Sequence, residues 1–124
     1  MSRLERERWK QAEEQWPTLQ RVISEHFARV TFEPVQHLPK IYESYAQSAK
    51  LEELKAVATE CAEFLKAFSD RYDDVHFMID GFGALVPPRG KIYDSGDHAG
   101  IRRIKLLYDP VVATIRKTEQ DWKP

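Results

Sequence analysis

Apolar residues recur at alternating intervals of three and four in three long stretches of the chain. The clearest stretch lies in residues 51–72, and its positions share one side of a helix: Leu51, Leu54, Ala58, Cys61, Leu65, Phe68 and Tyr72. No glycine or proline interrupts residues 48–74, and Ser48 with Glu52 has the form of a capping box. The pattern predicts one amphipathic helix of about 24 residues.

The same spacing recurs between Trp9 and Val30, preceded by Ser2 and Glu5 as a second potential capping box. Pro17 lies within this stretch and removes one backbone donor. We therefore expect either a kink at Pro17 or a break after which Pro17 opens a second helix.

The third stretch runs from Ile101 to Trp122, where Asp109 and Pro110 read as an N-cap and a first helical residue. This helix is expected to be bent or restarted at that point. Pro39 can begin a further short helix. Stripes of this length bury one another by lying side by side, so the sequence predicts an all-α fold, an antiparallel bundle of four to five helices forming a single domain over residues 1–124.

The segment from residue 75 to residue 96 does not show an unambiguous helical spacing of apolar residues. Residues 75–82 fit both a strand and a helix, and a Gly/Pro-rich loop or small β-hairpin is expected at about 81–96. All five glycines of the chain lie between Gly81 and Gly100. Their spacing matches neither a Walker loop nor a dinucleotide-binding loop, and we expect no nucleotide and no other cofactor.

Composition places the chain among soluble, cytoplasmic proteins. It has 124 residues, of which 42% are hydrophobic, a net charge of −1 and one cysteine, Cys61. A single cysteine excludes an internal disulfide and a thiolate metal cage within one chain. The N-terminus lacks a signal-peptide pattern, and no stretch approaches the roughly 18 apolar residues of a membrane span, so no membrane association is expected.

The near-zero net charge conceals a segregation along the chain. Residues 51–80 contain three basic and eight acidic residues, whereas residues 81–124 contain eight basic and five acidic residues. The acidic face of the central helix could complement a basic groove on another protein, and the glycine-rich segment adds apolar and charged residues to such a contact. The predicted partner-binding residues are Glu52, Glu53, Glu60, Glu63, Asp70, Asp73, Asp74, Phe82, Arg89, Tyr93, Asp94 and Asp97.

Binding to a basic protein is the favoured function, and an immunity protein or antitoxin that neutralises a basic toxin or nuclease is one example. Neither His/Asp group of the chain reproduces a known metal-ligand pattern, and a homodimeric structural subunit is a further alternative. The alternative is a small metal-dependent hydrolase or nuclease using His76, Asp94, Asp97 and His98, although those aspartates also suit helix capping. Nucleic-acid binding would use a basic cluster of Arg102, Arg103 and Lys105 with Arg89 and Lys91, but an isoelectric point near 6.4 disfavours it.

Overall fold

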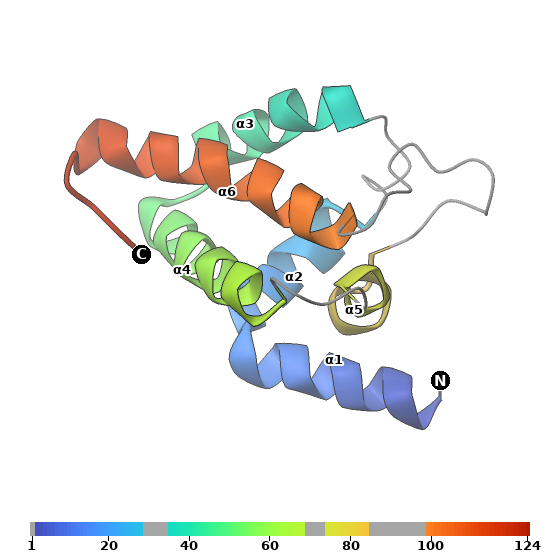
Figure 1. The fold of residues 1–124 in the computed structure, drawn as a ribbon. Coiled ribbons are helices and arrows are strands. Elements are labelled where there is room, and N and C mark those ends of the chain that lie inside the picture. Colours follow the sequence, from blue (N-terminus) through green and yellow to red (C-terminus); the bar gives the residue numbers. More distant parts are fainter. Residues whose placement is uncertain (1, 29–34, 69–73, 85–98) are drawn as a thin grey trace.

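The N-terminal apolar pattern folds as two helices, α1 (Arg3–Gln15) and α2 (Pro17–His26), in the computed structural model (Figure 1). The structure describes residues 2–28, 35–68, 74–84 and 99–124. Ser2 and Glu5 form the predicted capping box. Pro17 is the first residue of α2, where its missing N–H removes no helical hydrogen bond, so the predicted break is the correct alternative.

The central helix is shorter than its apolar pattern predicts. A 3₁₀ turn (Val35–His37) leads into α3 (Leu38–Ser48), and α4 (Leu51–Ala67) has 17 residues. The capping box predicted for Ser48 and Glu52 is wrong, because Ser48 ends α3 and its hydroxyl donates to the Tyr45 carbonyl (3.0 Å). Ala49 and Lys50 are extended, so the chain turns between the two helices.

The ambiguous segment forms a helix, α5 (Asp74–Phe82), and the last pattern forms α6 (Ala99–Thr118). α6 continues through Pro110 instead of restarting there, and the Thr114 hydroxyl donates to the Pro110 carbonyl (2.8 Å). The expected hairpin falls mostly within residues 85–98, which lie outside the described part of the chain. Among the described residues there are six α-helices and no strand, one helix more than the upper prediction, because α5 adds to the divided N-terminal pattern.

The helices form a bundle in which α6 packs against both α3 and α4 (Figure 1). On the other side α1 packs against α5, and α2 contacts α1, α4 and α5, so that α2 joins the two groups. The predicted helical bundle is therefore confirmed. Within the described ranges, no helix is long and apolar enough to cross a membrane.

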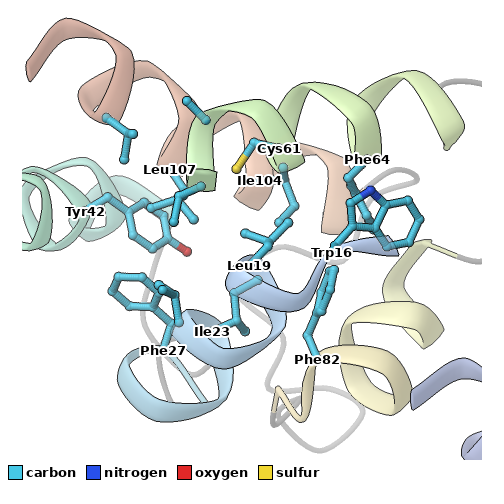
Figure 2. Close-up of a cluster of buried hydrophobic side chains, with 14 of the residues drawn as sticks. Trp16, Leu19, Ile23, Phe27, Tyr42, Cys61, Phe64, Phe82, Ile104 and Leu107 are labelled. Carbon is cyan, nitrogen blue, oxygen red and sulfur yellow. The ribbon is translucent and has the colours of Figure 1, made fainter. Parts of the chain in front are cut away.

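Side chains from α2 to α6 meet in one core (Figure 2). Trp16 lies at the corner between α1 and α2 and contacts Phe64 edge-on, with ring centroids 5.4 Å apart. Phe82 at the end of α5 packs on the same two rings and is fully buried. The prediction that Phe82 belongs to a partner-binding surface is therefore wrong, because its side chain has no exposed area to offer.

Candidate functional site

The predicted acidic face divides into two classes along α4. Glu52 and Glu63 are exposed, whereas Glu53 and Glu60 are partly buried. Asp74 begins α5, but its side chain is outside the described part of the structure. The remaining predicted contact residues also lie outside it: Asp70, Asp73, Arg89, Tyr93, Asp94 and Asp97.

Glu53 connects α4 to α2 and α3. Its carboxylate accepts hydrogen bonds from the Arg21 guanidinium and from the Tyr45 hydroxyl, the latter at 2.8 Å. The hydrogen bond from Arg21 lowers the pKa of Glu53, and burial raises the pKa of Tyr45. Glu53 therefore contributes to helix packing, and its charge is balanced by Arg21.

Glu60 replaces the missing N-cap of α2. Trp16 occupies the N-cap position without a side-chain hydrogen bond to the helix, and the first backbone donors of a helix need acceptors from elsewhere. The Glu60 carboxylate accepts from the Leu19 N–H at 2.9 Å. Burial raises the pKa of Glu60, while hydrogen bonds from Leu19 and Thr18 act in the opposite direction.

A groove of about 480 Å³ lies on the outer side of α4, between the start of α2 and the C-terminal tail. We call it the α4 groove. The tail turns back from α6 towards α4 (Figure 1), where Glu119 forms an ion pair with Lys55 and the Arg116 guanidinium donates to the Trp122 carbonyl (3.2 Å). Its lining includes Ala56, Thr59 and Trp122, two glutamates, Glu60 and Glu63, and two lysines, Lys55 and Lys123.

Two of the predicted acidic residues thus lie in one groove with a half-buried indole. The periodic pattern placed Trp122 on an apolar helix face, but α6 ends at Thr118 and Trp122 lies in the tail. Its backbone N–H donates to the Glu119 carbonyl (3.1 Å), so a turn returns the indole to the core edge. Sequence reasoning did not identify Trp122 as a surface residue, and no local signal marks that turn.

A second hollow surface follows α3. One hollow of about 630 Å³ includes His26, Tyr45 and Lys50, and an adjoining hollow of about 460 Å³ includes Lys40. Both hollows have Ser44 in their lining, so they adjoin at this residue. We call the two adjoining hollows together the α3 groove. None of its residues except Glu53 belongs to the predicted contact set.

The structure describes Arg102, Arg103 and Lys105 of the predicted basic cluster, but not the side chains of the alternative catalytic group. Asp94, Asp97 and His98 lie outside the described residues, as does the His76 side chain, and elsewhere in the described part no group of three or more His, Cys, Asp or Glu side chains could hold a metal. Arg103 is only 5% exposed, so it cannot act with Arg102 and Lys105 as a surface phosphate contact.

Cys61 behaves as a core residue. Its side chain is fully buried on α4, and burial raises the pKa of the thiol. A protonated, inaccessible thiol is neither a nucleophile nor a metal ligand.

No protein-family model, curated protein or solved structure matches the chain.

Proposed function

We propose that the protein is a binding module that attaches to a basic surface of another protein through the outer face of α4. A neutralising role of the immunity or antitoxin type is the use we favour for such a module. The observation that carries the proposal is the contrast between the four acidic residues of α4. Glu53 and Glu60 hold helices together, whereas Glu52 and Glu63 are exposed and make no hydrogen bond or ion pair within the described part of the chain.

Glu52 and Glu63 share one side of α4. They are eleven positions apart in the sequence. At 3.6 residues per turn this places them three turns apart, within about 20° of each other around the axis and separated by about 16 Å along it. Exposed charges separated by more than about 8 Å interact weakly at physiological salt, so the two carboxylates act as separate contact points. Two such points fix the orientation of a partner better than one.

The α4 groove between these points supports the same proposal. Ala56, Thr59, Glu63 and Trp122 line it together with Lys55 and Lys123, and Lys55 is ion-paired with Glu119. Indole rings are enriched among the residues that dominate interface energies, and they attract Lys and Arg side chains placed over their faces. A basic side chain from the partner would meet the exposed Glu63 carboxylate and the Trp122 ring here, beside Lys55, whose charge is paired with Glu119.

Affinity purification from the native cell at low salt tests the proposal. The wild-type chain should retain a basic protein in near-stoichiometric amount, and the E52K/E63K variant should lose it. The E13K/D109K variant changes the net charge by the same amount at exposed positions of α1 and α6, and it should retain the partner. Absence of a basic partner, or equal retention by E52K/E63K, would show the assignment to be wrong.

The neutralising role has its own test. Expression of the isolated partner in a host lacking this chain should slow growth, and co-expression of the wild type should restore it. The E52K/E63K variant should fail to restore growth. A partner that is harmless when expressed alone would refute neutralisation while leaving the binding surface itself intact.

A further inference from the structure

The α3 groove is a second surface, and its charged lining residues are two lysines, Lys40 and Lys50, and one glutamate, Glu53. Its two hollows have volumes of about 630 and 460 Å³ and meet at Ser44. Lys40, Ser44 and Ser48 line it and follow one another at intervals of four, so they share one face of α3. The groove therefore runs along the helix, with Lys40 in one hollow and Lys50 in the other.

We propose that the α3 groove binds an acidic, extended segment of a partner protein. The 11 residues of α3 span about 16 Å, which corresponds to about five residues of extended chain. This inference is independent of the contact proposed for α4, which requires a basic partner surface.

Positive charge at the groove is not cancelled by its one carboxylate. Lys40 and Lys50 are both exposed. Glu53 borders the groove, but the Arg21 guanidinium and the Tyr45 hydroxyl already occupy its carboxylate. An acidic side chain would therefore meet a lysine towards either end of the groove. Between the lysines lies the Glu53–Arg21 ion pair, whose two charges compensate each other. This arrangement is electrostatically complementary to an acidic segment.

The groove also has an aromatic floor. The Tyr45 ring packs edge-on against Phe27, with centroids 5.2 Å apart, and lies 5.6 Å from the His26 ring. Ile41 adds a half-buried aliphatic side chain in the second hollow. Interfaces combine such apolar centres with polar rims, so the preferred segment would carry apolar residues between its acidic ones.

Peptide is favoured over nucleic acid by the small number of cations. Two exposed lysines neutralise few phosphates, and nucleic-acid affinity depends mainly on how many phosphates are neutralised. Ser44, which is exposed, supplies a hydroxyl that can pair with a peptide N–H or carbonyl. An extended acidic peptide uses each of these features.

Fluorescence anisotropy with a labelled peptide of about ten residues, in which Glu alternates with Leu, tests the proposal. The control peptide carries Gln in place of every Glu. At about 50 mM salt the acidic peptide should bind about tenfold more tightly than the control and weaken as salt is raised. K40E/K50E should weaken binding about tenfold or more, whereas K10E/K105E, at exposed positions of α1 and α6, should change it less than about twofold.

The charge-reversed variant is expected to fold. Lys40 is the third residue of α3 and Lys50 is the N-cap of α4, and acidic residues near helix N-termini are favoured by the helix dipole. Circular dichroism and urea unfolding check this. E52K/E63K should bind the peptide as the wild type does, which separates this surface from the one on α4.

Three results of the peptide experiments would overturn the proposal. They are equal affinity for the acidic and Gln peptides, equal losses in K40E/K50E and K10E/K105E, and displacement of the peptide by single-stranded RNA at matched charge. A dimer in light scattering that K40E/K50E dissociates would also overturn it, because a second copy of the chain would then occupy the groove.

Discussion

Replacement of Glu60 tests how the structure holds α2 to α4. Glu60 is half-buried, and its carboxylate accepts from the Leu19 N–H at 2.9 Å in place of an N-cap side chain. Leu19 is completely buried, so water has little access to its N–H once the carboxylate is removed. Loss of an N-cap costs about 1 kcal/mol, and a hydrogen bond to a charged group contributes about 1.5–3 kcal/mol.

We expect Glu60→Ala to lower the free energy of unfolding by about 1–2 kcal/mol. This is less than the upper end of the range for a hydrogen bond to a charged group, because the carboxylate is partly exposed to water. Glu60→Gln keeps an acceptor oxygen and should cost less. Urea unfolding followed by tryptophan fluorescence measures both, since the buried Trp16 immediately precedes α2. Glu63→Ala, one turn further along α4 and exposed, is the matched control and should change stability by less than about 0.5 kcal/mol.

The pH dependence supplies a second readout. Burial raises the pKa of Glu60 above its usual value of 4.5, so the folded state binds this proton more tightly than the unfolded state. The associated stabilisation is present below pH 4.5 and is lost as pH rises through the folded pKa. Relative to Glu60→Gln, the wild type should therefore lose stability as pH rises from about 4.5 and then level off.

Two outcomes would refute this account of Glu60. The first is a cost for Glu60→Ala no larger than for Glu63→Ala, which would mean that the α2 terminus does not depend on the carboxylate. The second is a difference between wild type and Glu60→Gln that grows in favour of the wild type as pH rises, which would require a lowered pKa.

Three further predictions concern the core. The Gln20 amide donates to the Trp9 and Gly81 carbonyls at 2.9 and 3.0 Å, so Gln20→Leu should cost about 2–3 kcal/mol in urea unfolding; a change below about 0.5 kcal/mol would contradict this bridge. Cys61 should react with a thiol reagent only on the unfolding timescale, and rapid native labelling would contradict its burial. Burial raises the pKa of Tyr42 from 10 to about 12, so stability should fall as pH rises through that interval; Tyr42→Phe should flatten the loss, and an unchanged alkaline slope would count against it.

Helix identity was largely readable from local sequence. The spacing of apolar residues identified α1, α2, α4 and α6, and the Ser2–Glu5 box and the break at Pro17 were correctly placed. These features depend on groups within a few positions of one another, such as a cap and the N–H it accepts from. The end of α4 at Ala67 was not readable, because the apolar spacing continues to Tyr72, and its N-cap was misplaced at Ser48 because the turn at Ala49 and Lys50 contains neither glycine nor proline.

The roles of the acidic residues depended on tertiary structure. In the sequence Glu53 and Glu60 look like Glu52 and Glu63, since all four are glutamates on the same helix. Their partners are far away in the chain: Arg21 is 32 positions from Glu53, and Leu19 is 41 positions from Glu60. Only the packing of α2 on α4 distinguishes a carboxylate that caps a helix from one that faces solvent.

The basic and aromatic residues show the same division. Arg103 stands in a cationic run with Arg102, yet it is buried, and Phe82 stands in a glycine-rich segment, yet it completes the aromatic core. The sequence by itself determined that the chain forms amphipathic helices, because helical periodicity is a local property. Which charges and rings remain on the surface was decided by tertiary structure, because burial depends on contacts between residues distant in the chain.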